Sequence, residues 1–303
     1  MIVRYLQSWI SEAAALSTCL PVSVTPALMS LRRILRVIFL LLLIPVLLLL
    51  GCQSRLIYYP QPNHEGLHKT LAKQKGQPVE YQTPQGRQVA FYIPPRSGAP
   101  GTPDTIWLCF AGNGSLALHW LSLLREWDPS FGYLLVDYPG YGDCQGKPSP
   151  ATIRESSKAA VTALAAHLKL TPQDLQPRLA VLAHSIGCAA GLMAAEDQQV
   201  KRIVLVAPFT TMTEMGRRVL GWPLCYLNIH RFDNRKHLAA VVKQGAKVVI
   251  FHGTADEIIP VSMSRELAAA HPESVTLHEE LGQDHNFILG NCSTRIGEAM
   301  MKR

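Results

Sequence analysis

Hydrophobic residues follow two different patterns along the chain from about residue 105 onward. Short continuous apolar runs are separated by longer segments in which apolar residues recur every three to four positions. The continuous runs are typical of buried strands, and the three-to-four spacing is typical of helices that cover a sheet. The expected strands are 105–112, 133–140, 178–185, 201–209, 247–253 and 274–281. The expected helices are 115–127, 151–170, 186–196, 261–270 and a last one from about 286.

Strands that are apolar throughout and alternate with helices indicate a mostly parallel sheet with helices on both faces. Upstream of this series, residues 78–95 predict two short strands around a turn at Gln85-Gly86. Residues 210–246 interrupt the alternation, and we expect a short irregular or helical insertion there. The pattern therefore predicts one α/β domain over residues 76–303 that carries a short insertion.

The N-terminal region has a different pattern, with an apolar run at 37–50 that follows Arg32, Arg33 and Arg36. A basic segment followed by an apolar run is typical of a secretory signal. The run is shorter than the roughly 20 residues that a membrane-spanning helix needs. Pro45 also weakens a continuous helix through it.

The end of this run, "LLGC", resembles a bacterial lipobox, which implies that Cys52 is lipidated and becomes the mature N-terminus. An uncleaved membrane anchor, or a secretory signal cut elsewhere, is the alternative. Residues 1–28 fit a signal poorly, and a start at Met29 would give an ordinary one, so we interpret 1–28 as a start-site artefact. We predict a targeting segment at 1–51, a tether at 52–75, and a membrane-anchored lipoprotein in the cell envelope of a bacterium.

Composition limits the class of protein. The 303 residues are 48% hydrophobic and 17% charged, which fits one large globular domain or two small ones. The formal net charge of +7 includes four arginines against one glutamate in residues 1–51, and the other basic residues are scattered. This predicts no nucleic-acid partner and at most a mild attraction to anionic lipid. The cysteines after residue 52 lack metal-ligand spacing, so we expect no metal site.

Polar features follow four of the predicted strands at their carboxyl ends, where open parallel sheets bind ligands. They are "FAGNGS" after the 105–112 strand, Ser185, Asp256 in "FHGTADEIIP" and His285 in "LGQDHNF". The order serine, acid, histidine, with a small-x-Ser-x-Gly strand-to-helix turn, resembles the α/β-hydrolase superfamily over residues 76–303. The resemblance implies an α/β-hydrolase fold with a short cap insertion.

In that family the serine is the nucleophile, the histidine its base and the acid the partner of the histidine, which assigns these roles to Ser185, His285 and Asp256. Ala183 stands where the usual motif has its first glycine, and the turn needs only a small residue there. The plain alternatives are a helix N-cap serine, a surface histidine, and Glu257 as the acid.

Acyl transfer also needs backbone N–H donors where the oxyanion develops. The resemblance places them at Ile186 and at Asn113, the latter in a glycine-flanked turn that could also be a plain turn. Candidate pocket residues are Tyr138, Met212, Met215 and Trp222, although residues of the insertion could merely cover the sheet.

The predicted function is a serine hydrolase that cleaves a carboxylic ester or thioester through an acyl-enzyme. The branch that it resembles contains single-domain acyl-thioesterases and depalmitoylases and implies no metal or organic cofactor. A small cap and a tether favour a lipidic or acylated small-molecule substrate, and the oligomeric state is left open. The alternatives are a peptidase of the prolyl-oligopeptidase type and a catalytically silent hydrolase fold that serves as an envelope binding or scaffold protein.

Overall fold

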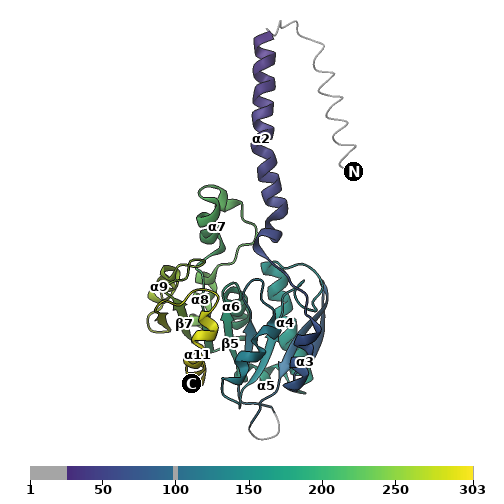
Figure 1. Cartoon of the computed structure of the whole chain (residues 1–303), viewed down its shortest axis with the longest axis vertical. Helices are drawn as coiled ribbons and strands as arrows, with labels where there is room; N and C mark the ends of the chain where they lie inside the picture. The colour runs from purple at the N-terminus through teal and green to yellow at the C-terminus, as the bar shows by residue number, and fades with distance from the viewer. Residues whose placement is uncertain (1–25, 98–101, 303) are drawn as a thin grey trace. The chain divides into compact units, whose positions relative to one another are not determined.

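The computed structural model describes residues 26–97 and 102–302 (Figure 1). Most of the predicted start-site artefact at 1–28 therefore lies outside the described residues. The chain divides into two compact units, residues 1–51 and 52–303. The described part of the first unit belongs to helix α2 (Pro26–Ile57), whose last residues belong to the second unit. Within the described ranges, no helix combines the length and the hydropathy that crossing a membrane requires.

The second unit is built on an eight-stranded sheet in the order β1-β2-β4-β3-β5-β6-β7-β8. The first two strands pair antiparallel with each other, β2 pairs antiparallel with β4, and the other neighbours are parallel. The strands are β1 (Gln77–Thr83), β2 (Gly86–Ile93), β3 (Ile106–Phe110), β4 (Gly132–Val136), β5 (Leu179–His184), β6 (Arg202–Val206), β7 (Lys247–Gly253) and β8 (Val275–Glu280). The predicted mostly parallel sheet is confirmed.

Helices cover both faces of the sheet because successive strand residues point to opposite sides. In β3, Leu108 belongs to one buried apolar cluster and Trp107 to the other. The first cluster lies under α4 (Pro150–His167), α6 (Gly187–Gln198), α8 (Asn234–Lys243) and α9 (Val261–Ala269). The second lies under α3 (Glu65–Lys73), the 3₁₀ helix η1 (Ala117–Arg125), α10 (Ile288–Asn291) and α11 (Ser293–Met301). The short α5 (Pro172–Leu175) and η2 (Gln176–Arg178) lead into β5.

The expected insertion at 210–246 separates into two parts. Helix α7 (Met212–Leu220) and the 3₁₀ helix η3 (Leu224–Leu227) form a cap, and α7 projects from the body of the domain in Figure 1. Its base is closed by a bridge between Thr211 and Asp233. Helix α8 then packs against α6, so it is the ordinary crossover helix between β6 and β7. The cap is thus confined to the first part of the 210–246 segment, because Leu238 and Val241 of α8 are buried in the apolar cluster on the α6 face.

Candidate active site

The turn between β5 and α6 holds Ser185 in a left-handed backbone conformation with φ of +57°. A non-glycine residue rarely adopts this region, and such strain persists only where the surrounding structure enforces it. The Ser185 N–H donates to the Val206 carbonyl of the neighbouring strand, and α6 starts two residues later at Gly187. The strand-to-helix turn expected from the sequence is therefore present.

Gly187 lets the start of α6 lie directly on the end of β3. A Cβ at this position would be 2.3 Å from the Phe110 carbonyl oxygen and 2.6 Å from that of Ala111. Gly191, one turn later, similarly faces the side chains of Val181 and Ala183, each of which would lie 2.9 Å from an added Cβ. The small residues of α6 thus set how closely the helix approaches the sheet.

We expect Gly187→Ala to destabilise the protein by about 3 kcal/mol, because rigid backbone oxygens cannot move away from the new methyl group. Urea unfolding of the full chain measures the change. Gly290→Ala is the matched control, since nothing lies within 4 Å of a Cβ there. Equal stability of the two variants would contradict the packing argument.

Three side chains form a continuous hydrogen-bonded chain at the carboxyl ends of β5, β7 and β8. Ser185 Oγ lies 2.9 Å from His285 Nε2, and His285 Nδ1 lies 2.7 Å from Asp256 Oδ2. All three residues are buried. The structure therefore brings together the three residues that the sequence analysis selected. A proton held on Nδ1 by Asp256 leaves the Nε2 lone pair facing the serine hydroxyl.

Asp256 is buried, yet several donors surround its carboxylate. Oδ1 accepts the N–H groups of Ile258 and Ile259, and Oδ2 lies 3.2 Å from His252 Nε2 as well as near His285. Burial by itself raises the pKa of Asp256, but hydrogen bonds from His252, His285 and the Ile259 N–H outweigh it and hold the pKa well below its ordinary value. The carboxylate is therefore ionised at neutral pH and can stabilise a protonated His285.

His252 is a second histidine on Asp256 that the sequence analysis did not select. Its ring is fully buried, with Nε2 2.8 Å from the Ile259 carbonyl oxygen and Nδ1 2.6 Å from Ser264 Oγ. Because both neighbours of Nε2 are acceptors, Nε2 carries the proton and Nδ1 accepts from the hydroxyl. The His-Gly pair that ends β7 was the available signal, but only the fold shows that the ring turns toward Asp256.

The two expected oxyanion donors lie in turns that approach each other. A Cβ at Gly112 would be 3.3 Å from Ser185 Cβ, so the turn after β3 lies against the nucleophile. Gly114 completes that turn with φ of +70°. Among the described residues, neither the Asn113 N–H nor the Ile186 N–H has a hydrogen-bond acceptor within the protein. Both N–H groups are thus available to a ligand oxygen.

The side chain of Asn113 ties this turn to the last residue of α2 and to the segment that follows it. Its Nδ2 donates to the Ile57 carbonyl at 2.6 Å, and its Oδ1 accepts from the Tyr59 N–H and the Tyr141 hydroxyl. These three hydrogen bonds hold the turn in place, and among the described residues the backbone N–H of Asn113 has no acceptor within the protein. No local sequence signal predicted this contact, because its partners are 56 residues apart.

The four candidate pocket residues differ in how deeply they are buried. Tyr138 is buried and donates its hydroxyl to the Ala111 carbonyl, so it supports the turn after β3. Met212 and Met215 are partly buried and pack against the apolar cluster on the α6 face. Trp222 is 72% exposed. The structure therefore brings the two methionines to the core side of the cap and leaves Trp222 on its outer side.

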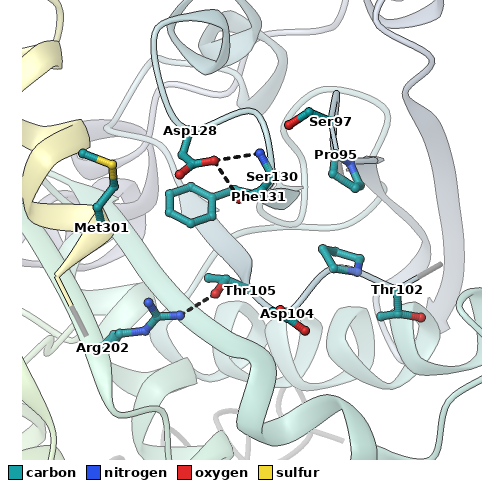
Figure 2. Close-up of a pocket in the computed structure, with 11 residues that line it drawn as sticks. Pro95, Ser97, Thr102, Asp104, Thr105, Asp128, Ser130, Phe131, Arg202 and Met301 are labelled. Atoms are coloured by element: carbon teal, nitrogen blue, oxygen red, sulfur yellow. Dashed lines mark hydrogen bonds between the residues drawn. The ribbon is translucent and has the colours of Figure 1, made fainter. Parts of the chain in front are cut away.

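A hollow of about 300 Å³ lies at the opposite end of the strands, and Figure 2 shows side chains that line it. In it Asp128 accepts hydrogen bonds from Ser130, and Arg202 donates to Thr105 Oγ1. The hollow lies at the amino ends of β3 and β6, and none of the selected residues lines it. In the described ranges, no group of three or more His, Cys, Asp or Glu residues is placed to hold a metal ion. The hydrogen-bonded serine remains the candidate reaction centre.

His184 packs its ring against that of His285, with ring centroids 5.1 Å apart, and its Nε2 lies 3.1 Å from the His285 carbonyl oxygen. Burial, and then the nearby His285, lower the pKa of His184 from 6.5 to about 4. The pairing agrees with a packing role for this residue.

This lowered pKa predicts a loss of stability in mild acid. Between pH 6.5 and about 4 the unfolded chain binds a proton at His184 that the folded chain does not, so stability falls as the pH falls through this window. The unfolding free energy of His184→Gln should depend less steeply on pH there. His64→Gln, at an exposed position, serves as the control and should keep the wild-type slope. Parallel slopes for all three proteins would contradict the prediction.

Comparison with known proteins gives matches over this same domain. Residues 99–287 match the sequence profile of a family described as "Alpha/beta hydrolase family". An uncharacterized protein of Mycobacterium tuberculosis is 29% identical over 242 residues, which cover 77% of this chain and 80% of the relative. An esterase structure from Pyrococcus furiosus aligns with a TM-score of 0.61 and 15% identity, over 80% of this chain and 96% of the esterase. A puromycin-hydrolyzing peptidase of Mycobacterium tuberculosis aligns with a TM-score of 0.56 and 17% identity, over 74% of this chain but only 38% of the peptidase.

Proposed function

We propose that this chain, which belongs to the alpha/beta hydrolase family, is a serine hydrolase that cleaves carboxylic ester or thioester bonds through an acyl-enzyme. The observation that carries the proposal is the hydrogen-bonded chain from Ser185 through His285 to Asp256. The left-handed backbone at Ser185 supports it, because nothing in a plain helix N-cap requires that strain.

The reaction begins when His285 Nε2 takes the hydroxyl proton and Ser185 Oγ attacks the carbonyl carbon. The carbonyl oxygen then becomes an oxyanion that accepts the N–H groups of Ile186 and Asn113. His285 gives its proton to the departing alcohol or thiol, which leaves an acyl group on Ser185. A water molecule deprotonated by His285 Nε2 attacks the acyl carbon, the bond to Ser185 Oγ breaks as the carboxylic acid is released, and His285 returns its proton to Ser185 Oγ. Asp256 stabilises the imidazolium during both halves of the reaction.

The substrate in this proposal is a lipidic or acylated molecule at the cell envelope. Met212 and Met215 on α7 supply flexible apolar surface on the core side of the cap, which suits an acyl chain. The proposed location follows from the sequence before residue 53, where a signal-like run ends in Gly-Cys. Cys52 is exposed in the structure and is accessible to a lipid-transferring enzyme.

A fluorophosphonate probe tests the proposed function on the purified full chain. We expect the probe to label one peptide, and mass spectrometry to place the modification on Ser185. A series of p-nitrophenyl esters and acyl thioesters of increasing chain length then measures acyl preference. A folded protein that neither reacts with the probe nor cleaves any ester or thioester would overturn the proposal, and faster cleavage of peptide amides would favour a peptidase.

Metabolic labelling with palmitate tests the proposed lipidation separately. Incorporation into the wild-type chain in a bacterial host should disappear in Cys52→Ala. Label that persists in the variant would place the acyl group elsewhere and remove the support for a lipoprotein.

A further inference from the structure

The outer side of the cap carries a run of large apolar side chains that are open to solvent. We call this surface the cap face, and its residues are Val219, Leu220, Trp222, Leu224, Tyr226 and Ile229. Val219 is 81% exposed, Trp222 72%, Ile229 62% and Tyr226 60%. Isolated exposed apolar residues are common on proteins, but a cluster of them marks a surface that binds something.

The cap has its own buried side, so the cap face is not apolar surface that the core has failed to cover. Met212 and Met215 already pack inward from α7, and Cys225 is buried against the same helix near Gly216. The Thr211–Asp233 bridge closes the base of the cap. The cap therefore has its own inward packing, and none of the six cap-face residues belongs to or packs against either buried apolar cluster.

The charged side chains within the cap segment itself have one sign. Residues 215–231 contain Arg217, Arg218 and Arg231 and no aspartate or glutamate, and all three arginines are exposed. The acid just before this segment, Glu214, is paired with Arg235. Arginines among tryptophan, tyrosine and aliphatic residues are typical of segments that lie in the interface of an anionic bilayer.

Exposed apolar residues also border the reaction centre itself. Ile258, two residues after Asp256, is 51% exposed, and Phe287, two residues after His285, is 65% exposed. Both follow strands whose carboxyl ends carry the candidate triad. The apolar surface is therefore not limited to the cap.

The chain itself indicates which partner the cap face would meet. Gln53 donates to the Leu227 carbonyl at 2.7 Å and accepts the Ile229 N–H at 2.8 Å, and Ser54 Oγ lies 3.1 Å from His230 Nε2. Gln53 directly follows Cys52, where the proposed lipidation would place acyl chains. A bilayer that holds those acyl chains would lie next to the cap.

We propose that the cap face is a lipid-binding surface that seats on an anionic bilayer and admits membrane-borne acyl substrates to Ser185. The lipid contact rests on the exposed residues and their charges. The substrate route rests in addition on the proposed function.

Trp222 provides the direct measurement, because the other described tryptophans, Trp107, Trp120 and Trp127, are at most 3% exposed. Trp9 lies outside the described residues and is replaced by phenylalanine. We reconstitute the full-length Trp9→Phe chain in vesicles of phosphatidylcholine and phosphatidylglycerol. We expect brominated acyl chains to quench the fluorescence of Trp222, and the bilayer to shield Trp222 from quenching by aqueous acrylamide. The same chain with Trp222→Phe should lose both effects. Trp222 fluorescence that is not quenched by brominated lipid but is still quenched by acrylamide would overturn the proposal.

The charge and the route are tested with Arg218→Glu/Val219→Asp. In vesicles that contain phosphatidylglycerol, this variant should show less quenching of Trp222 by brominated lipid. Reversing the charge at Arg218 should lower the affinity for the anionic surface by about fivefold or more. Hydrolysis of a soluble short-chain ester should be unchanged, whereas hydrolysis of a vesicle-borne acyl ester should fall.

Quenched Trp222 fluorescence without any hydrolysis would support the lipid contact and refute the proposed function. Shielding of Trp222 without lipid, with dimers in sedimentation, would instead assign the face to a second copy of the chain.

Discussion

Ser185→Ala is expected to reduce kcat/KM for esters by about 10⁵- to 10⁶-fold while the protein stays folded. The variant removes the only hydroxyl that His285 Nε2 contacts at hydrogen-bond distance among the described residues. Without it no acyl-enzyme forms, and the remaining rate comes from water held near the Ile186 and Asn113 N–H groups. Ester hydrolysis at saturating and subsaturating substrate, with urea unfolding on the same samples, measures both properties.

Ser122→Ala is the matched control for this prediction, because Ser122 is exposed and bonded only to the His119 carbonyl in its own helix. It should retain the wild-type rate and the wild-type reaction with the fluorophosphonate probe. A Ser185→Ala protein that still hydrolyses esters at more than a hundredth of the wild-type rate would assign the nucleophile to another residue.

Asp256→Asn should reduce kcat by about 10⁴-fold, with a smaller effect on KM. The Asn oxygen will stay on the side of the Ile258 and Ile259 N–H groups, because those donors need an acceptor. The Asn NH₂ group then faces His285 Nδ1, which must become an acceptor. That tautomer carries its proton on Nε2 and cannot take the proton of Ser185.

Glu257→Gln separates this role from a general loss of negative charge. Glu257 is exposed and adjacent in the sequence, and it was the competing candidate for the acid. It should keep the wild-type kcat. If Glu257→Gln lost activity and Asp256→Asn kept it, the hydrogen bond between His285 and Asp256 would have no part in catalysis. Solution NMR of the His285 ring protons would report the tautomer in either variant.

Ala183 illustrates how far the sequence could be interpreted. The motif allowed a small residue before Ser185, but it did not say why an alanine is accommodated. In the structure the Ala183 methyl packs against Gly191, so the glycine of α6 supplies the space that the motif usually takes from a glycine in the strand. Ala183 and Gly191, eight residues apart, must together be small enough for α6 to lie close to β5.

The sequence by itself determined the strands, most of the helices and the order in which Ser185, Asp256 and His285 appear. It could do so because strands buried on both faces are apolar throughout, because helices that cover a sheet repeat apolar residues every 3.6 positions, and because parallel strands share one carboxyl edge. Only the tertiary structure decided that His252 turns to Asp256, that Asn113 holds the Ile57 carbonyl, and that Gln53 binds the cap 174 residues away. These contacts depend on which strands become neighbours in the sheet and on how the loops return, and no local pattern of residues records that arrangement.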